Sequence, residues 1–459
     1  MYTRKKPGIL IIAFVGILVL GAVPTSAQLS RSLPVPILET QPPETPKNSA
    51  QNPTVVVSPL GDQIGDNFVI RNDIGLVEEH PAIAYSSLQQ EYLVVWYNDR
   101  SGNDDIRGQR VSRNGELIGG AFYISAGPGA DRRYPAVSYN SKHDQYLIVW
   151  EHNDGLWNSI RARRVSGTGA VLDTTDIVLT SGSNIITPAK PAVEYAYTSD
   201  KYLVVWQETF HPIPIQSDIL GQVVSSSGTL EGSPFVISKD PGNIPRKNPV
   251  LAYNRKRNEF LVVWQKYYSS SIDFVIGRRV TGGGLPLNPA EIVIHAVTVS
   301  STNPSVAALP DATASGQYLV VFELLYPPSN YNIYSRFVSG EGVVGAGQYI
   351  ASSSEDETHP AIASNEVSKR YLVAWTRPTS PPIVYDYIAG RSISTTGALI
   401  GAEKYIGGFP LADQAVISSG PFGDFMIAFK DQQPPSIDSG IYGQLWGDRV
   451  YLPLTLRNH

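Results

Sequence analysis

The most regular feature of the chain is a run of five apolar residues that ends on an aromatic side chain. The first copy is Tyr92-Leu93-Val94-Val95-Trp96, and six more follow at intervals of 53 to 58 residues. The later copies end at Trp150, Trp206, Trp264, Phe322, Trp375 and Phe429. These runs are β-branched, aliphatic or aromatic and do not alternate with polar residues. Each therefore predicts a short strand that is covered on both faces.

A fixed period of this length is typical of repeat architectures. Doubly covered strands also occur in parallel α/β sheets, but those need helices between the strands. The intervals here are filled by Pro, Gly, Ser and Asn and show no helical spacing of apolar residues. The expected fold class is therefore all-β, a seven-bladed β-propeller of four-stranded antiparallel blades.

The other strands of the repeat can be placed around this one. A preceding strand, Pro81–Tyr85 in the first copy, is made mostly of small residues that suit the crowded axis of the ring. A following strand carries one long side chain with several donors in every copy. These residues are Gln109, Arg163, Gln222, Arg278, Arg336, Arg391 and Gln444. We favour a hydrogen-bonding strut for them, because buried donors need partners; a ring of ligand donors is the alternative.

The seventh copy lacks its fourth strand, and the beginning of the repeat region supplies a match. Residues 61–70 align without gaps to residues 115–124, which hold the fourth strand of the first copy. An N-terminal strand is therefore expected to complete the last blade and to remove an open sheet edge. The alternative strand, Val450–Leu454, contains Pro453, which cannot donate to a ladder.

Four segments are expected along the chain. Residues 1–27 combine Arg4, Lys5 and Lys6 with an apolar run and small residues, which predicts a signal peptide cleaved after Ala27; an uncleaved anchor is the alternative. Residues 28–57 are rich in Pro and polar residues and predict a disordered linker. Residues 58–449 are expected to form the propeller and residues 450–459 a C-terminal tail. The mature chain is expected to be secreted or displayed on the cell surface, with no membrane span.

The repeat carries a resemblance to a known group of proteins. Its second strand ends in Val-Val-Trp and its third begins with Asp-Ile, and over residues 59–446 it resembles repeats of uncharacterised secreted bacterial β-propellers. The tail Tyr451–Leu454 resembles a short C-terminal sequence found on secreted proteins of some filamentous bacteria. The resemblance implies the fold and secretion, and it implies no particular activity.

Composition and motifs exclude several kinds of chemistry. The chain has no Cys, which rules out disulfides, thiolate metal sites and a cysteine nucleophile. Its net charge of −5, without a basic block, argues against nucleic-acid binding. The seven His form no zinc motif, and there is no nucleophile elbow, phosphate loop or calcium loop. No metal, cofactor or catalytic residue is predicted, and the oligomeric state is left open.

Superposition of the repeats suggests a site at one mouth of the central channel. The residues that precede the innermost strands are polar or aromatic and are expected to ring this mouth. They are His80, Tyr134, Lys190, Asn248, Asn303, His359 and Asp413. Solvated residues at the start of each strand are the alternative. Glu194 is the one carboxylate within an innermost strand, and pairing with an arginine is favoured over a ligand contact.

Aromatic residues outside the repeated strand suggest contact with a partner. Trp157 lies in a loop with Gly and Asn and is a candidate for stacking, whereas the repeated Trp residues are expected in the core. The favoured function is a binding or interaction module for an extracellular glycan or protein. The first alternative is a polysaccharide hydrolase or lyase at the channel mouth, and the second is a structural component of the envelope.

Overall fold

The computed structural model describes most of the repeat region. The described residues are 62–73, 75–99, 103–211, 216–239, 244–269, 272–287, 291–326, 330–379, 385–408, 411–432 and 438–447. The predicted signal peptide, linker and C-terminal tail lie outside them. Among the described residues, no helix has the length and apolar character needed to cross a bilayer.

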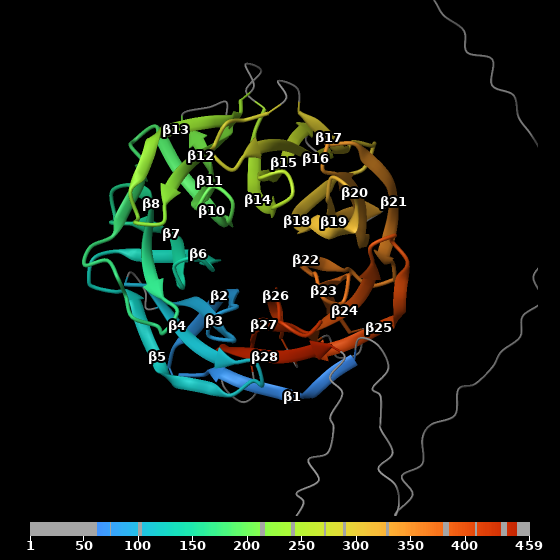
Figure 1. The fold of residues 1–459 in the computed structure, drawn as a ribbon, viewed down its shortest axis with the longest axis horizontal. Helices are drawn as coiled ribbons and strands as arrows, with labels where there is room; N and C mark the ends of the chain where they lie inside the picture. Colours follow the sequence, from blue (N-terminus) through green and yellow to red (C-terminus); the bar gives the residue numbers. More distant parts are fainter. Residues whose placement is uncertain are drawn as a thin grey trace, which may run out of the picture. The chain divides into compact units, whose positions relative to one another are not determined.

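The described residues form seven four-stranded antiparallel sheets around a central channel, as Figure 1 shows. The chain is therefore a seven-bladed β-propeller, as the repeat predicted. In each of blades 1 to 6 the strands follow one another outward from the channel. Blade 1 consists of β2 (Val77–Ser86), β3 (Glu91–Asp99), β4 (Asp105–Ser112) and β5 (Leu117–Ser125). Blade 2 consists of β6 (Asp131–Asn140), β7 (Gln145–Asn153), β8 (Asn158–Ser166) and β9 (Ile177–Ser181). Blade 3 consists of β10 (Ile186–Ala196), β11 (Lys201–Phe210), β12 (Gln216–Ser225) and β13 (Leu230–Ser238).

The remaining blades repeat this order, with one short helix inserted in the fifth. Blade 4 consists of β14 (Arg246–Asn254), β15 (Glu259–Ser269), β16 (Ile272–Thr281) and β17 (Ile292–His295). Blade 5 consists of β18 (Ser301–Leu309), β19 (Gln317–Tyr326), β20 (Asn330–Ser339) and β21 (Val344–Ala351), with the 3-10 helix η1 (Pro310–Ala312) after β18. Blade 6 consists of β22 (Thr358–Asn365), β23 (Arg370–Pro378), β24 (Asp386–Ser394) and β25 (Leu399–Gly407). Blade 7 combines β26 (Asp413–Ser419), β27 (Phe425–Asp431) and β28 (Gly440–Gly447) with β1 (Asp62–Arg71) from the other end of the repeat region.

The repeated apolar run is the second strand of every blade, and it is buried throughout. Every residue from Tyr92 to Trp96 has 0% of its surface exposed. Leu93 and Val95 pack toward blade 2, in a cluster that includes Trp150. The alternate residues, including Trp96, pack toward blade 7 in another cluster. Because each blade is covered on both sides by its neighbours, the strand has no solvent face and no polar residue within the run.

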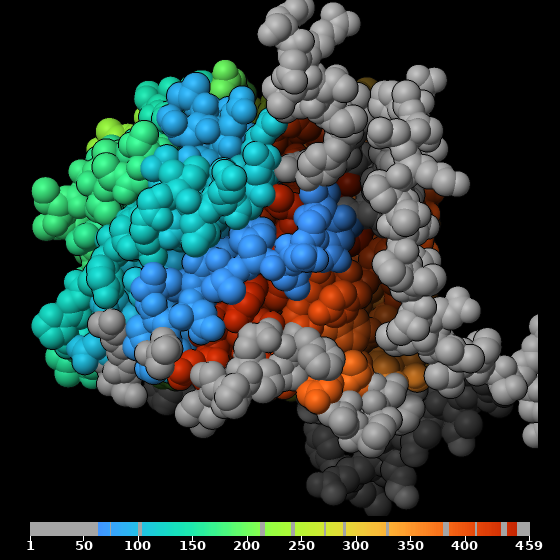
Figure 2. Space-filling model, turned by 90° about the horizontal axis from the view of Figure 1, so that it is seen from below, coloured from blue at the N-terminus to red at the C-terminus, as the bar shows by residue number. Residues whose placement is uncertain are grey.

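The ring is closed by β1, which pairs antiparallel with β28. Phe68 lies opposite Gly443, and a side chain at that glycine would collide with the ring of Phe68. Ile70 is buried in the cluster that holds Trp96 and Ile441. In Figure 2 the blue β1 lies directly across the red strands of the last blade. The predicted closure by an N-terminal strand is confirmed.

The long side chains on the third strands act within the sheet framework. Gln109 donates to the carbonyls of Ile118 (3.1 Å) and Gly119 (3.3 Å), on the outermost strand of its own blade. Arg163 donates instead to the carbonyl of Ile124 in the preceding blade, at 2.9 Å. These contacts are those of struts that tie each outermost strand to its own or the next blade.

Candidate functional site

Every innermost strand contains a bulge, and in six of the seven copies the bulge residue stands directly before a proline. There the register with the second strand shifts, and the residue takes a left-handed backbone conformation. The bulge residues and their φ angles are His80 (49°), Tyr134 (52°), Lys190 (53°), Asn248 (52°), Asn303 (47°), His359 (50°) and Gln414 (57°). This conformation is unfavourable for residues with a Cβ, and backbone strain of this kind gathers at functional sites.

The bulges bring their side chains together at one mouth of the channel. His80, Tyr134, Lys190, Asn248 and Gln414 line a cavity of about 380 Å³. Asn303 and His359 continue the ring, and the amide of Asn303 lies 3.4 Å from that of Asn248. Six of the seven residues chosen from the sequence therefore occupy equivalent positions.

The seventh bulge is occupied by Gln414, where the sequence alignment had placed Asp413. The other six bulge residues precede a proline, but the seventh copy has Ala415 at that position, so the alignment slipped by one residue. Asp413 stands one residue before the bulge, and its carboxylate reaches the imidazole of His359. The amide oxygen of Gln414 accepts the backbone N–H of His80 at 2.7 Å and so links the last blade to the first.

On one side of the mouth, aromatic and cationic groups are packed against each other. The rings of His80 and Tyr134 meet edge-on with centroids 4.5 Å apart. The ammonium of Lys190 lies 3.2 Å from the centre of the Tyr134 ring. Burial lowers the pKa of Lys190, and the carboxylate of Glu151 opposes this shift. Nδ1 of His80 lies 3.4 Å from the carboxylate of Glu79.

Carboxylates on the second strands accept hydrogen bonds from the backbone of the bulges and hold it in place. Glu151 accepts the backbone N–H of Lys190 at 2.7 Å, and Glu323 accepts that of His359 at 2.8 Å. Burial raises the pKa of Glu151. By contrast, the hydrogen bond to His80 and the ammonium of Lys430 lower the pKa of Glu79 to about 2. Carboxyl groups at this mouth therefore differ in their preferred protonation state.

A second group of interacting side chains at the mouth comes from blades 6 and 7. His359 Nδ1 is 2.9 Å from Asp413 Oδ1, which also accepts the hydroxyl hydrogen of Thr376 at 2.9 Å. The hydrogen bond to Asp413 raises the pKa of His359. Burial alone would raise the pKa of Asp413, but the hydrogen bond and charge of His359 outweigh burial and lower it.

Asp386, at the start of β24, lies near Asp413, because its backbone carbonyl accepts the N–H of Ala412 at 3.0 Å. Burial raises the pKa of Asp386, and the negative charge of Asp413 raises it further. Two neighbouring carboxyl groups are thus driven toward opposite protonation states, with the imidazole of His359 beside them. Sequence reasoning missed Asp386, because only the residues that precede the innermost strands were compared. The signal available was its position: Asp104 and Asp273 stand at the same place in other copies.

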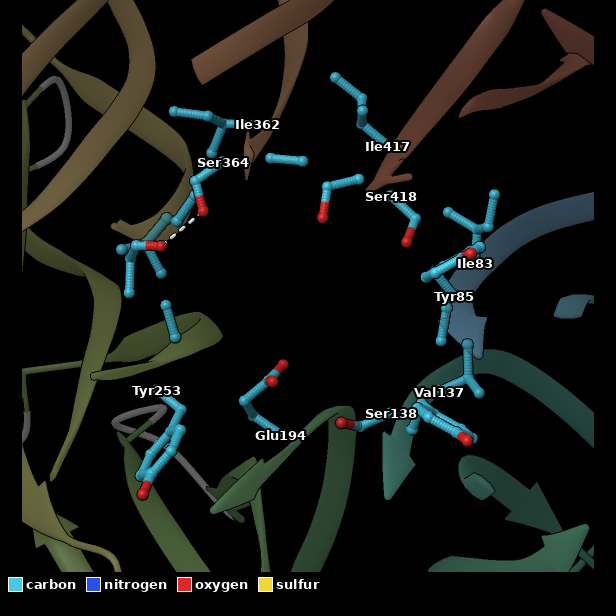
Figure 3. Close-up of a pocket in the computed structure, with 18 of the residues that line it drawn as sticks. Ile83, Tyr85, Val137, Ser138, Glu194, Tyr253, Ile362, Ser364, Ile417 and Ser418 are labelled. Atoms are coloured by element: carbon cyan, nitrogen blue, oxygen red, sulfur yellow. Dashed lines mark hydrogen bonds between the residues drawn. The ribbon is translucent and has the colours of Figure 1, made fainter. Parts of the chain in front are cut away.

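Glu194 lies deeper in the channel, four residues beyond Lys190 in β10. Figure 3 shows its carboxyl group pointing into a cavity of about 380 Å³, with the hydroxyls of Ser138 and Ser418 also facing the opening. Burial raises the pKa of Glu194 to about 7. Within the part of the chain that the structure describes, no ion pair holds this carboxyl group, so the expected arginine partner is not found there.

Replacing Glu194 by glutamine is expected to stabilise the protein only at higher pH. The carboxyl group has a pKa of about 7 in the fold against an ordinary value of 4.5, so the folded protein binds its proton more tightly than the unfolded chain. Ionisation therefore lowers the stability of the native protein as the pH rises through this window. We expect Glu194→Gln to be near neutral at about pH 4.5 and to add about 1–3 kcal/mol at about pH 8. Denaturant titrations at both pH values measure this difference.

The matched control for this test is Glu116→Gln, which changes an exposed carboxyl group on the turn between β4 and β5. Its effect on the free energy of unfolding is expected to be small at both pH values. An equal effect of Glu194→Gln at both pH values would show that the channel carboxyl group is not desolvated.

The other residues singled out in the sequence lie apart from these groups. Trp157 is partly exposed in the turn between β7 and β8, on the face of the ring that carries the bulges. The repeated Trp residues are buried in the core, as expected. No cluster of three or more His, Asp or Glu residues suited to a metal ion occurs among the described residues.

Comparison with known proteins identifies the fold and no family. No protein-family model matches the chain, and no curated protein matches it. A protein of unknown function from Dyadobacter fermentans DSM 18053 is similar over 85% of this chain and 99% of its own, with 10% identity and a TM-score of 0.50. An α-L-arabinanase from Penicillium chrysogenum gives 13% identity and a TM-score of 0.43 over 69% of this chain and 93% of its own. The Hadza microbial sialidase Hz136 gives 10% identity and a TM-score of 0.44 over 67% of this chain and 66% of its own.

These comparisons overturn the expectation of a binding or interaction module. The similar structures whose names state an activity include an arabinanase, a sialidase and an arabinofuranosidase, all of which act on glycans as enzymes. The physical reason for the error is that the repeat pattern describes packing between blades and cannot distinguish a binding module from an enzyme. Because such low identity shows the fold alone, the activity of this chain has to be argued from its own residues.

Proposed function

We propose that the protein is an extracellular glycan hydrolase whose site is the channel mouth ringed by the seven bulges. The observation that carries the proposal is the juxtaposition of Asp386 and Asp413: the Asp386 carbonyl accepts the N–H of Ala412, the neighbour of Asp413, at 3.0 Å, and the two carboxyl groups have pKa shifts in opposite directions. Glycoside hydrolysis requires such a pair, because one group must donate a proton while the other is ionised.

The two carboxyl groups have distinct roles in this proposal. Asp386, whose pKa is raised, donates its proton to the glycosidic oxygen as the bond to the anomeric carbon breaks. Asp413, held ionised by His359, stabilises the positive charge that develops on the sugar ring. A water molecule supplies hydroxide to the anomeric carbon, and its remaining proton returns the acid–base pair to its starting state. His359 is a positioning residue, since it acts through Asp413.

The rest of the mouth has the character of a sugar site. Asn248, Asn303 and Gln414 offer amide donors and acceptors, and Tyr134 offers an aromatic ring. Sugar hydroxyls pair with amides, and the apolar face of a sugar ring packs on aromatic rings. The apolar segment and basic residues of positions 1–27 support secretion of the protein, which would place this site where polysaccharides are found.

A lyase is the second candidate, favoured by the cluster of His80, Tyr134 and Lys190 on the other side of the mouth. A β-elimination at a uronic acid needs a base that removes a proton next to the carboxylate and a cation that neutralises this carboxylate. The lowered pKa of Lys190, which lies on the Tyr134 ring, suits it to the role of the base. In that case the leaving sugar takes a proton, and a double bond remains in the uronic acid.

A panel of polysaccharides incubated with the protein lacking residues 1–27 tests the proposal. We expect new reducing ends from at least one neutral polymer, without the ultraviolet absorbance of an unsaturated uronic acid. Reducing ends accompanied by this absorbance would instead identify the lyase. If no arabinan, xylan, galactan, glucan or uronic acid polymer were cleaved, both enzymatic proposals would fail, and a structural role would be favoured.

A further inference from the structure

We infer that the half of the channel away from the bulges binds a small organic ligand through its primary ammonium group, with the carboxylate of Glu194 as the counter-charge. Each innermost strand runs from its bulge toward the turn that joins it to the second strand. Glu194 stands four residues beyond Lys190 in this direction, which is about 13 Å along an extended strand. The cavity that Glu194 faces shares no lining residue with the cavity at the bulges. The inferred site is therefore separate from the mouth to which the proposed hydrolase activity belongs.

Glu194 is not needed for the packing of the blades. Seven equivalent positions, one on each innermost strand, lie opposite the second residue of the buried apolar run. Four of them hold alanine and two hold serine, so a small side chain is sufficient to build a blade. The one carboxylate in this ring has no ion pair among the described residues. A charged group in a cavity without a partner lowers the stability of the fold, and such groups are typical of binding and catalytic sites.

The side chains of this ring present hydrogen-bond acceptors to the cavity. In Figure 3 the carboxyl group of Glu194 points into the opening, and the hydroxyls of Ser138 and Ser418 face the same opening. The oxygen of Ser138 also accepts the backbone N–H of Tyr195 at 3.0 Å, which fixes this hydroxyl beside β10. A primary ammonium group has three donors and no acceptor, so a carboxylate and hydroxyl oxygens are suitable partners for it.

The charge and size of the cavity set the class of ligand. No Lys, Arg, His or Asp is among the described residues that line it, so Glu194 supplies its single charge. Ca²⁺ requires six or more oxygen ligands, and no group of three or more His, Asp or Glu that suits a metal occurs in the described ranges. The volume of about 380 Å³ is that of a site for a small organic molecule, and Ile83, Val137 and Ile417 add aliphatic surface for its carbon atoms. Alkylamines and amino derivatives of sugars share the required ammonium group.

Titration calorimetry at about pH 8 tests the inference with two amines and their neutral counterparts, since alkyl ammonium groups stay protonated at this pH. The pairs are n-butylamine with n-butanol, and glucamine with sorbitol. We expect at least one amine to bind, and its neutral counterpart to bind at least about tenfold more weakly. Binding of butylamine alone would identify alkylamines as the ligand class, and binding of glucamine alone would identify amino derivatives of sugars. If neither amine bound, or if each neutral molecule bound as tightly as its amine, the inference would be overturned.

The Glu194→Gln variant locates the binding. The amide keeps the shape of the side chain but carries no charge, so the affinity for the amine should fall at least about tenfold. Because this variant is expected to be more stable than the natural protein at the same pH, unfolding would not explain the loss. The matched control is Glu116→Gln, which changes an exposed carboxyl group and should leave the affinity unchanged. Equal affinities in the natural protein and in Glu194→Gln would contradict the assignment.

The affinity should also depend on pH in a direction set by the same carboxyl group. Burial raises the pKa of Glu194 to about 7, so the group is largely protonated at about pH 5.5 and ionised at about pH 8. The other titratable side chains that line the cavity are Tyr85, Tyr139 and Tyr253, and phenols ordinarily ionise at about pH 10. The amine should therefore bind at least about tenfold more weakly at the lower pH, and Glu194→Gln should not show this difference. The same affinity at both pH values would count against the inference. Since cleavage is not measured, every result is independent of the proposed hydrolase.

Discussion

Deleting residues 58–71 is expected to lower the melting temperature more than any single core substitution in the protein. The deletion removes β1, which leaves the whole edge of β28 without hydrogen-bond partners. It also removes Ile70, which has only 2% of its surface exposed and packs in the cluster between blades 7 and 1. Loss of a buried Ile side chain alone costs about 2–5 kcal/mol. Thermal unfolding followed by circular dichroism measures the change.

Two controls separate closure of the ring from simple shortening of the chain. Deletion of residues 28–57, a segment rich in Pro and polar residues, should leave the melting curve unchanged. Ile70→Ala should lower the stability by about 2–5 kcal/mol, whereas Val69→Ala, on the exposed face of the same strand, should change it by less than about 1 kcal/mol. If the protein without residues 58–71 melted at the same temperature as the full chain, β1 would not be the closing element.

The fold could be predicted because its determinants repeat. Each second strand is buried on both sides, so every copy is subject to the same demand for apolar residues, and the period becomes visible without any knowledge of contacts. The closing strand was identified by the same logic. Phe68 lies opposite Gly443 just as Phe122 lies opposite Gly108, so the alignment of the two segments reflects the same register in different blades.

The site could be predicted only in part, because its residues differ from one copy of the repeat to the next. The bulge residues were found through the prolines that follow six of them, and the seventh was displaced by one residue where Ala415 replaces the proline. Asp386 belongs to a third strand, and nothing in the sequence says that this strand begins beside Asp413. Its contribution depends on packing between blades 6 and 7, which only the structure shows.

The channel carboxylate illustrates the same limit. The sequence marked Glu194 as an exception in a strand of small residues, but it could not show what faces it across the channel. Other blades place alanine or serine at this level, including Ala84, Ser138 and Ser418. The carboxyl group therefore faces an open cavity instead of the arginine that a buried charge would normally require.

Replacing Asp386 by asparagine is expected to reduce the cleavage of a neutral glycan by about 10²–10⁴-fold, since general acid catalysis contributes about this much. The amide retains the shape of the side chain but cannot give a proton to the leaving oxygen. The loss should be much smaller for a nitrophenyl glycoside, because a nitrophenolate departs without protonation. Asp413→Asn should lower the rates for both substrates, since it removes the charge that stabilises the sugar cation. Initial rates on the polymer and on the nitrophenyl glycoside measure these effects.

The dependence of the rate on pH follows from the same two groups. The active form needs Asp413 ionised and Asp386 protonated. The pKa of Asp413 lies below its ordinary value and that of Asp386 above it, so the active form is populated between the two. The rate should fall at low pH as Asp413 gains a proton and at high pH as Asp386 loses one. In Asp386→Asn the fall at high pH should disappear.

The matched control is Asp273→Asn, which changes the equivalent position of blade 4 and should preserve both rate and profile. If Asp273→Asn and Asp386→Asn reduced the rate equally, the effect would be structural, and the assignment of the proton donor would have to be abandoned.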